Sequence, residues 1–406
     1  MKTLKKEIIV LFCFLLNISA FAQSQKTNPE FEKYFQQQGD TIYKAFINKN
    51  YDQLLSLLSD LEKRYTALPQ EQVKTYTSWA SEEIYYNFAC AYSLTNQKDK
   101  AIDYFDKALN LGYKDRAHVD EDTDLDNIRS DERFIKLVES IPSYIEILQK
   151  AAEYTPADTT GLPHFDYESM SNGRLKSVRE YFDLDSIAGQ GDELSKIMNL
   201  MTWVHNTFRH DGSHYVSNSE YDAMDLYNYY KTTGQGINCR MMAIVLNECY
   251  LSMGFKSRFV TCLPQDANDQ DCHVITCVYS QTLNKWVWMD PTFNAYLKDE
   301  DGTLLSIEEV RNRLIENKPI VLNEDANWNN KNKQTKKGYV DMYMAKNLYW
   351  LQCSAISCFN PESPYRNNTN TYVSLTPTGF EGFNRSVKAV VTHDPAYFWQ
   401  APKSEK

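Results

Sequence analysis

The sequence lacks two features that would indicate a nucleic-acid-binding or membrane-embedded protein. It has no stripe of basic residues, because Asp and Glu outnumber Lys and Arg by 54 to 43 and give a formal charge of −11. An acidic chain of this kind binds nucleic acid and anionic membrane surfaces poorly, so neither is expected as a partner. Beyond residue 22, no apolar run approaches the length of a membrane-spanning helix, and no span is expected.

Cysteine pairs at metal-binding spacing are also missing. Nine cysteines are present, none of them in a C-x-x-C pair, and they are scattered over a long chain. This distribution argues against a structural zinc site and against a small disulfide scaffold, so no metal and no other cofactor is expected. Cys353 and Cys358 are close enough in sequence to form a local bridge in an oxidising compartment.

The first 22 residues have the pattern of a cleavable secretory leader. Lysines precede an apolar run from Ile8 to Ile18, and an A-x-A sequence that ends at Ala22 is followed by polar residues. The pattern predicts a signal peptide over 1–22 with cleavage after Ala22. The mature protein is therefore expected to be secreted or periplasmic, and the style of the leader is bacterial.

The segment 23–150 contains few residues that interrupt helices. Aromatic and leucine side chains recur in it at three- and four-residue spacing, which is typical of amphipathic helices. In EIYYNFACAYSLTNQKDKAIDYFDKALNLG, small side chains at Ala89, Ala101 and Ala108 would let two antiparallel helices approach closely. This stretch resembles a tetratricopeptide repeat, and we interpret 23–150 as a helical domain that could bind a protein partner.

The rest of the chain changes character after this helical segment. The loop-like sequence YTPADTTGLPHFD favours a linker over 151–190. A helical stretch followed by the strand-like runs KSRFVTCL, CHVITCVYS and KWVWMD predicts an α+β domain over 191–322. The remainder, 323–406, contains further strand-like runs and is interpreted as a β-rich C-terminal extension.

One cysteine stands at the start of a predicted helix. In TTGQGINCRMMA, Asn238 is a good N-cap for the apolar helix that follows Cys239, and Gly254 is suited to end that helix. The unpaired N–H groups and the helix dipole at an N-terminus stabilise a thiolate. Cys239 is therefore a candidate nucleophile, although the pattern also fits a small, inert buried thiol.

A histidine and an aspartate lie on two runs that predict a β-hairpin. The turn-like sequence QTLN joins the run with His273 to the run that ends at Asp290. A turn centred near Thr282 would place His273 opposite Asp290 or Pro291, with about 5 Å between opposed Cβ atoms. The carboxylate could then orient the imidazole and stabilise its protonated form. If the Cys239 helix packs against the same face, a thiol, a base and an orienting carboxylate lie in hydrogen-bond reach of one another.

Other histidines and thiols in this region have structural interpretations. His205 lies beside the apolar stripe of its helix and is expected in the core or at the surface. His210 and His214 follow in a polar loop and are expected to be solvated. Cys249 belongs to the apolar face of the helix that begins at Cys239.

Three of these segments together resemble the transglutaminase-like superfamily. GINCRMMAIVLNECYLSMGFKSRFVTC, DCHVIT and WVWMDPTF have its order and spacing over roughly 192–322. The resemblance implies a papain-like α+β fold in which Cys239 is the nucleophile, His273 the base and Asp290 the orienting carboxylate. The backbone N–H of Cys239 would be one oxyanion donor, and Gln235 could supply the second by reach alone. Further matching positions are Gly254, Arg258, Pro291 and Thr292.

The resemblance implies chemistry on amide bonds of a protein or peptide substrate. A thiolate attacks the amide carbonyl, the amine leaves with a proton from His273, and water or a second amine resolves the thioester. Hydrolysis is the expected outcome, because water is always present whereas selection of an amine needs a dedicated dry channel. The alternative is a non-catalytic binding or scaffold protein that keeps the fold and interacts through its helices.

Overall fold

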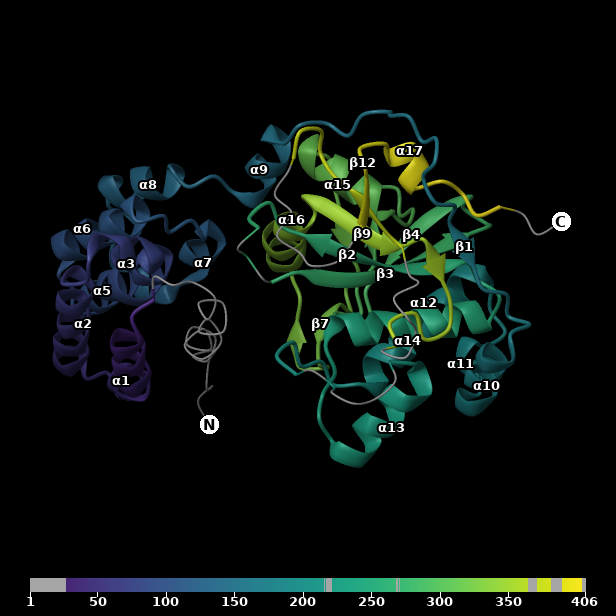
Figure 1. Cartoon of the computed structure of the whole chain (residues 1–406), viewed down its shortest axis with the longest axis horizontal. Coiled ribbons are helices and arrows are strands. Elements are labelled where there is room, and N and C mark those ends of the chain that lie inside the picture. Colours follow the sequence, from purple (N-terminus) through teal and green to yellow (C-terminus); the bar gives the residue numbers. More distant parts are fainter. Residues whose placement is uncertain are drawn as a thin grey trace. The chain divides into compact units, whose positions relative to one another are not determined.

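The computed structural model of the chain describes residues 27–214, 216, 221–267, 269, 271–363, 371–380 and 389–403. The predicted signal peptide lies outside these residues. The chain forms two compact units that divide after Ser143 (Figure 1), and each unit has a hydrophobic core of its own. Among the described residues, no helix is both long enough and apolar enough to cross a membrane.

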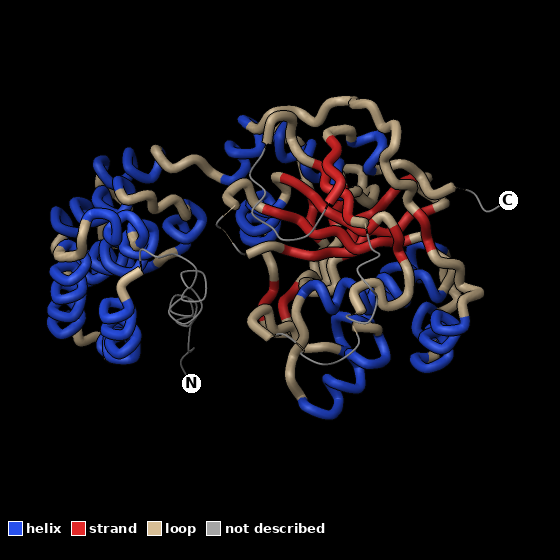
Figure 2. Tube along the Cα trace, in the orientation of Figure 1, coloured by secondary structure: helices blue, strands red, loops and turns tan. Residues whose placement is uncertain are grey.

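The first unit consists of helices in its described residues (Figure 2). These are α1(Pro29–Ile47), α2(Tyr51–Thr66), α3(Gln70–Thr75), α4(Thr77–Ala80), the π-helix η3(Ser81–Tyr86), α5(Asn87–Leu94), α6(Lys98–Asn110), α7(Arg116–Glu121), the 3₁₀-helix η4(Thr123–Leu125) and α8(Glu132–Glu139). Helices α5 and α6 pack together and bury Ala89, Ala101 and Ala108 completely. The prediction of a helical N-terminal region is confirmed, while its likeness to a tetratricopeptide repeat stays a prediction.

A six-stranded sheet forms the centre of the second unit (Figures 1 and 2). Its strand order is β12-β11-β9-β2-β3-β4, and neighbouring strands are antiparallel except for β11 and β12. The sheet strands are β2(Ser257–Leu263), β3(His273–Ser280), β4(Lys285–Met289), β9(Trp350–Ser354), β11(Tyr372–Leu375) and β12(Ala389–Thr392). Short two-stranded pairs are formed by β1(Asp166–Tyr167) with β10(Ile356–Ser357), β5(Leu297–Lys298) with β6(Val321–Leu322), and β7(Asn327–Trp328) with β8(Asn332–Lys333).

Helices cover both faces of this sheet (Figure 1). On one face, α14(Cys239–Ser252) packs against β2 and β3 and is surrounded by α10(Gly173–Phe182), α12(Glu193–Thr207) and α13(Ala223–Thr233), while α11(Leu184–Ala188) packs on α12. The other helices of this unit are α9(Tyr144–Lys150), α15(Ile307–Ile315), the π-helix η5(Lys337–Met344), α16(Ala345–Asn347) and α17(Pro395–Phe398). Because both faces are covered, β2 and β3 are buried along their whole length.

The predicted domain limits differ from the structure at two places. The expected linker 151–190 contains α10 and α11, which bury Leu175, Val178 and Leu184 in the same core as α14. Helix α9, which the sequence placed in the helical domain, contributes Leu148 to the core of the second unit. Helix α10 is rich in charged residues and α11 has only five residues, so the apolar pattern of both is weak.

The C-terminal region is not an appended β-rich extension. Its strands β9, β11 and β12 belong to the same sheet as β2, β3 and β4, and β9 pairs directly with β2. Strands were predicted at NLYWLQC and TYVSLTP, which overlap β9 and β11, whereas β12 was not predicted. The pairing of β9 with β2 joins segments about ninety residues apart, which local patterns do not encode. The predicted catalytic domain and the region 323–406 therefore form one fold.

A buried arginine connects β2 to the end of the described chain. Arg258 is 2% exposed, and its guanidinium lies 4.5 to 5.2 Å from the ring centres of Phe165, Trp286, Phe398 and Trp399. Its Nη2 also donates a hydrogen bond to the carbonyl oxygen of Phe398. Aromatic faces attract a cation, so these rings replace water around the buried charge.

Candidate functional site

Helix α14 begins at Cys239, and Asn238 caps it as the sequence predicted. The side-chain oxygen of Asn238 accepts a hydrogen bond from the backbone N–H of Met241 at 3.0 Å. The first turn carries no acidic residue, and residues 241–252 are all buried. The Cys239 thiol is therefore held on a fixed backbone at the positive end of the helix dipole.

Strands β3 and β4 form the predicted hairpin in a different register. Ser280 pairs with Lys285, so the turn spans residues 281–284 and is centred later than the sequence analysis assumed. His273 is consequently not directly opposite Asp290 or Pro291. The predicted turn centre lies too early along the chain, because the loop extends through Asn284, which adopts the left-handed conformation.

The two side chains nevertheless meet on one face of the sheet. Thr276 pairs with Met289, so in continued register Asp290 is level with Ile275, two residues from His273. Diagonal neighbours of this kind share a face and are within reach of long side chains. Nε2 of His273 lies 2.7 Å from Oδ2 of Asp290.

Cys239 reaches His273 at the end of the strand and not across the face of the sheet. Helix α14 packs on the opposite face, where Val274 contacts the helix and the Thr276 hydroxyl donates to the Ala243 carbonyl at 3.1 Å. His273 is the first residue of β3 and Cys239 the first of α14. The thiol and the imidazole meet there within hydrogen-bond reach.

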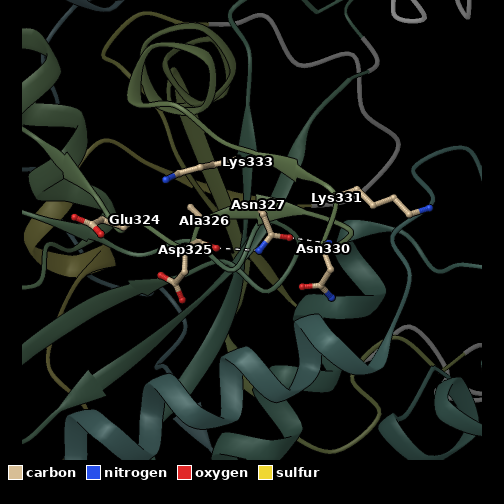
Figure 3. Close-up of a pocket in the computed structure, with 7 residues that line it drawn as sticks. All are labelled: Glu324, Asp325, Ala326, Asn327, Asn330, Lys331 and Lys333. Atoms are coloured by element: carbon tan, nitrogen blue, oxygen red, sulfur yellow. Dashed lines mark hydrogen bonds between the residues drawn. The ribbon is translucent and has the colours of Figure 1, made fainter. Parts of the chain in front are cut away.

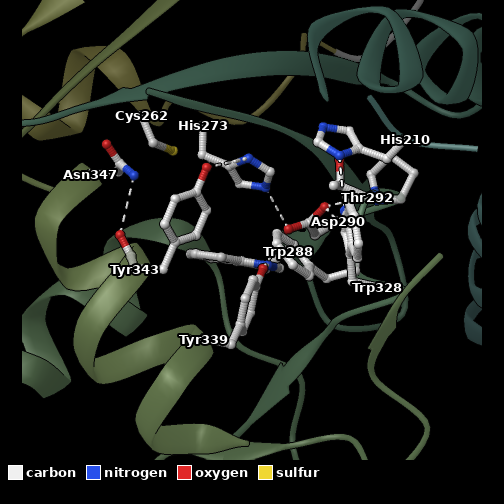
Figure 4. Close-up of polar contacts among 12 residues, drawn as sticks. His210, Cys262, His273, Trp288, Asp290, Thr292, Trp328, Tyr339, Tyr343 and Asn347 are labelled. Carbon is white, nitrogen blue, oxygen red and sulfur yellow. Dashed lines mark hydrogen bonds and ion pairs between the residues drawn. The ribbon is translucent and has the colours of Figure 1, made fainter. Parts of the chain in front are cut away.

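A buried hydrogen-bond network fixes Asp290 (Figure 4). Its Oδ2 accepts from the Tyr339 hydroxyl at 2.6 Å and faces His273, and its Oδ1 accepts from the backbone N–H of Thr292 at 2.8 Å. Tyr339 in turn accepts from the indole N–H of Trp288 at 3.2 Å. An ionised carboxylate only accepts hydrogen bonds, so Nε2 of His273 carries a proton and Nδ1 is left to face the thiol.

The electrostatics of the site favour a thiolate beside an imidazolium. Burial alone would raise the pKa of Cys239, but hydrogen bonds with His210 and His273 and the charge of His273 lower this pKa to about 6. Burial would lower the pKa of His273, but the charge of Asp290 and the hydrogen bonds with Asp290 and Cys239 raise it to about 10. Burial would raise the pKa of Asp290, and the charge and hydrogen bond of His273 hold it below its usual value instead.

A second histidine, expected to be solvated, also lies at the thiol. His210 is within hydrogen-bond reach of Cys239, and its Nδ1 accepts from the indole N–H of Trp328 at 3.0 Å (Figure 4). The expectation for His210 was therefore wrong. Its neighbour His214 contacts the hydroxyl of Tyr229 through Nε2 at 2.5 Å, so the two histidines have separate partners.

Gln235 lies in an exposed loop before α14. Its Oε1 accepts a hydrogen bond from the hydroxyl of Tyr229. Its role as an oxyanion donor stays a prediction.

His205 is a core histidine that supports the segment after Asp290. It is 2% exposed, and its ring nitrogens lie 3.0 Å from the carbonyl oxygen of Pro291 and 3.0 Å from the side-chain oxygen of Asn327. The structural interpretation of this residue agrees with its position. It ties helix α12 to the segment that carries Asp290.

Two tyrosines that the sequence analysis missed come from the region after 322. The π-helix η5 carries both Tyr339 and Tyr343. The ring of Tyr343 lies 5.2 Å from the imidazole of His273, and its hydroxyl is 3.5 Å from Nδ1. Residues spaced four apart share one side of a helix, so η5 presents both side chains to the site. Such π-helical turns frequently occur at functional sites.

Among the described residues, metal-ligating side chains gather in the first unit. Cys90, Asp122 and Asp124 offer ligand atoms within 4.8 Å of one another. The Asp122 carboxylate accepts hydrogen bonds from the Tyr86 hydroxyl at 2.8 Å, the Cys90 thiol at 3.4 Å and the Asp124 backbone N–H at 2.9 Å. These bonds cap a short helix and account for the cluster without a metal.

A polar pocket of about 260 Å³ lies on the loop that carries Trp328 (Figure 3). Its lining residues are Glu324, Asp325, Ala326, Asn327, Asn330, Lys331 and Lys333. Acidic and basic side chains both line it, and none of the three predicted catalytic residues does. The pocket is therefore separate from the thiol.

Comparison with known proteins shows that the segment that carries the site is similar to a known family. Residues 182–291, which include Cys239, His273 and Asp290, match the Transglutaminase-like superfamily. Curated protein sequences give no match. Among solved structures, a candidate cysteine protease from Cytophaga hutchinsonii is similar with 15% identity and a TM-score of 0.23, over 34% of this chain and 46% of that protein, less than half of its length. Residues 182–291 of the second unit are thus similar to the transglutaminase-like superfamily.

Proposed function

We propose that the protein is a thiol hydrolase that cleaves amide bonds of protein or peptide substrates. The observation that carries the proposal is the position of His273, which lies 2.7 Å from Asp290 and begins β3 where the Cys239 helix packs on that strand, and whose charge lowers the pKa of the Cys239 thiol. Nucleophilic acyl transfer needs a nucleophile, a base and an orienting group in this order. Cys239 is the nucleophile in this proposal, His273 transfers the proton, and Asp290 orients the imidazole.

The proposed reaction begins from the thiolate–imidazolium pair. The Cys239 sulfur forms a bond to the amide carbon, and the carbonyl electron pair moves onto oxygen. The C–N bond then breaks as His273 gives its proton to the leaving nitrogen, which produces a thioester and an amine. Water adds to the thioester and passes a proton to His273, and cleavage of the C–S bond releases a carboxylic acid and restores the thiolate.

We favour water over an amine as the acceptor in the second step. Water reaches any partly open site, whereas transfer to lysine requires a channel that excludes water and selects the amine. The expected products are therefore a free amine or ammonia and a carboxylic acid. Cross-linked products are not expected.

The location and the helical unit belong to the same proposal. The leader pattern at 1–22 supports action outside the cytoplasm, where peptide substrates of other cells or of the envelope are accessible. The first unit has its own core and helical surfaces, and we propose that it binds a protein partner or a protein substrate. Pull-down with the first unit alone would identify such a partner.

Alkylation of the thiol tests the proposal without knowledge of the substrate. The mature protein is treated with limiting iodoacetamide between about pH 5 and pH 9, and each cysteine is followed by peptide mass spectrometry. An ordinary thiol has a pKa of about 8.5 and reacts slowly at pH 6. Cys239 is expected to react rapidly at pH 6, and this advantage should vanish in His273→Ala.

Cys249 and free glutathione serve as the reference thiols for this test. Cys249, ten residues further along α14 and fully buried, should not react in the folded protein. If Cys239 at pH 6 reacts no faster than free glutathione, the thiol is not activated and the proposal is wrong. Loss of peptide hydrolysis in Cys239→Ala, with the melting temperature unchanged, is the second requirement.

A further inference from the structure

We propose that His210 is a further catalytic residue, whose ring N–H donates to the negative charge on the Cys239 sulfur and then to the oxygen of the attacked carbonyl. The inference rests on the proposed thiol chemistry at Cys239. It assigns to His210 the role of second oxyanion donor, for which the sequence offered only Gln235. This role of His210 requires a proton on the ring nitrogen that faces the sulfur.

Trp328 determines the tautomer of His210. An indole N–H can only donate, and it points at Nδ1 of His210 from 3.0 Å. Nδ1 must therefore present its lone pair, and the ring proton lies on Nε2. The backbone bridge with Ile237 places His210 beside the residues that lead to Cys239, and His210 lowers the pKa of that thiol. The ring nitrogen left to face the sulfur is therefore the one that bears hydrogen.

The two histidines at the thiol consequently have different chemistry. Asp290 faces Nε2 of His273 and supports a positive charge on that ring. The indole N–H of Trp328 is uncharged and donates to His210, so it does not stabilise a positive charge on the His210 ring. His273 is therefore suited to exchange protons, and His210 is suited to keep its proton and donate a hydrogen bond.

The backbone around His210 is held from two sides. On one side, the His210 N–H donates to the Asn329 side-chain oxygen at 2.7 Å, and the Asn329 amide donates back to the His210 carbonyl at 3.0 Å. On the other side, His210 forms a parallel β-bridge with Ile237. The Ile237 N–H donates to the Arg209 carbonyl at 3.0 Å, and the Ile237 carbonyl accepts from the Asp211 N–H at 2.9 Å. The ring is thus placed before substrate arrives, as electrostatic stabilisation requires.

Gly236 makes this close placement possible. A Cβ atom at position 236 would lie 2.6 Å from the carbonyl oxygen of Arg209 and 2.8 Å from Cβ of Asp211. Cβ atoms essentially never approach non-bonded atoms this closely, so a side chain here would push the His210 segment away. The glycine, three residues before Cys239, therefore lets the His210 backbone lie directly against the chain that leads to the nucleophile.

The proposed role follows the charge through the first reaction step. The negative charge starts on the sulfur and moves to the carbonyl oxygen as the S–C bond forms. These two atoms are then separated by about one hydrogen-bond length, so a donor at the sulfur can turn to the oxygen. The proton of His210 is not transferred, and no bond to its ring is made or broken.

Two substitutions at position 210 separate hydrogen bonding from space filling. His210→Phe keeps a ring and removes the donor, whereas His210→Gln keeps an N–H donor of similar reach. The measurement is the alkylation rate of Cys239 between pH 5 and pH 9, together with the melting temperature of each variant. A hydrogen bond to a charged group is strong, so His210→Phe should raise the pH midpoint by one to two units, or lower the rate at pH 6 by about ten- to a hundredfold. His210→Gln should restore most of that rate.

The outcomes distinguish this inference from the proposed function. If wild-type Cys239 is not reactive at pH 6, the thiol-hydrolase proposal fails and the inference with it. If the wild type is reactive and His273→Ala is not, but His210→Phe keeps the wild-type midpoint, only the inference fails. Equal impairment of folded Phe and Gln variants would also overturn it, because a donor role predicts rescue by Gln.

Trp328→Phe provides the test if His210→Phe does not fold. It removes the indole N–H and leaves both His210 and the aromatic ring at position 328. Loss of the tautomer control should shift the midpoint in the same direction and by less than His210→Phe. An unchanged midpoint in a folded Trp328→Phe protein would contradict the inference.

Discussion

At the scale of single residues, Asp290 sets the proton positions of the site. Its two oxygens face Tyr339, Thr292 and His273, and it is completely buried. An amide at this position would place a donor where an acceptor is needed. The imidazole of His273 would then lose the charge that stabilises its protonated form.

We expect Asp290→Asn to keep the fold and to disable the thiol. Without the carboxylate, the pKa of Cys239 should rise by about two units, so alkylation at pH 6 should fall about a hundredfold. Peptide hydrolysis should fall by a factor on the order of 10³ to 10⁴, as for an asparagine in place of a triad aspartate. Asp185→Asn, which alters an exposed ion pair with Arg179, is the matched control and should behave as the wild type.

The pH dependence of hydrolysis follows from the two shifted groups. The pKa of Cys239 is lowered to about 6, so activity should rise with pH as the thiolate forms. The pKa of His273 is raised to about 10, so activity should fall above that pH, where the proton for the leaving amine is lost. Initial rates across this range should give a bell with limbs near these two values. A single rising limb with a midpoint near the ordinary thiol pKa would contradict the assignment.

The sequence identified those residues of the site that carry a local signal. Asn238 and Cys239 were recognised from capping and periodicity, and His273 and Asp290 were placed on one hairpin even though the register was wrong. His210 had no such signal, because its defining contact is with Trp328, 118 residues downstream. Side-chain contacts of that range depend on the complete fold.

At the scale of elements, the site depends on two segments outside the three sequence motifs. The backbone around His210 lies against the residues before α14, and η5 brings Tyr339 under Asp290. The sequence likewise assigned α10 and α11 to a linker and the C-terminal strands to a separate extension, whereas both belong to the second unit. Local composition predicts that a helix or strand exists, whereas its neighbours are set by packing.

Gly236→Ala should destabilise the protein through the contact between these segments. The added methyl would meet the Arg209 carbonyl at 2.6 Å, and overpacking of this kind typically costs about 1–3 kcal/mol of unfolding free energy. Urea unfolding would measure the loss, and alkylation at pH 6 should slow because His210 is displaced. Gly173→Ala meets nothing within 4 Å and should change the unfolding free energy by less than about 0.5 kcal/mol.

Tyr339→Phe tests the contribution of η5. The variant removes the hydroxyl that donates to Asp290 and accepts from Trp288, which leaves a buried indole N–H without its acceptor. The expected loss is about 1–3 kcal/mol of unfolding free energy, together with slower hydrolysis. Tyr181→Phe, at a residue that is 49% exposed, is the control and should leave both measurements unchanged.

At the scale of the whole molecule, the chain contains two units with separate cores. Residues 144–406 hold all the groups discussed at the thiol, including those from the C-terminal region. The family match ends at 291 and the predicted catalytic domain at 322, but β9 lies between β2 and β11 in the sheet. The folded unit that holds the thiol therefore extends beyond either sequence-based boundary.

Two truncated fragments test which C-terminal boundary the folded unit requires. A fragment of residues 144–406 is expected to fold and to keep rapid alkylation of Cys239 at pH 6. A fragment of residues 144–322 lacks β9, β11, β12 and η5, and it should be unfolded by circular dichroism because β2 loses its neighbour. A folded and reactive short fragment would contradict the single-fold assignment.

The aromatic rings around Arg258 also determine when folding can finish. Phe398 and Trp399 complete the surroundings of this buried cation, so β2 cannot be buried at low cost until those residues have left the ribosome. A charge without its partners opposes burial strongly, and the nascent sheet should stay open until Phe398 and Trp399 have emerged. If the protein is secreted as we propose, an open chain of this kind could pass through a secretion channel, and its thiol would become reactive only after delivery.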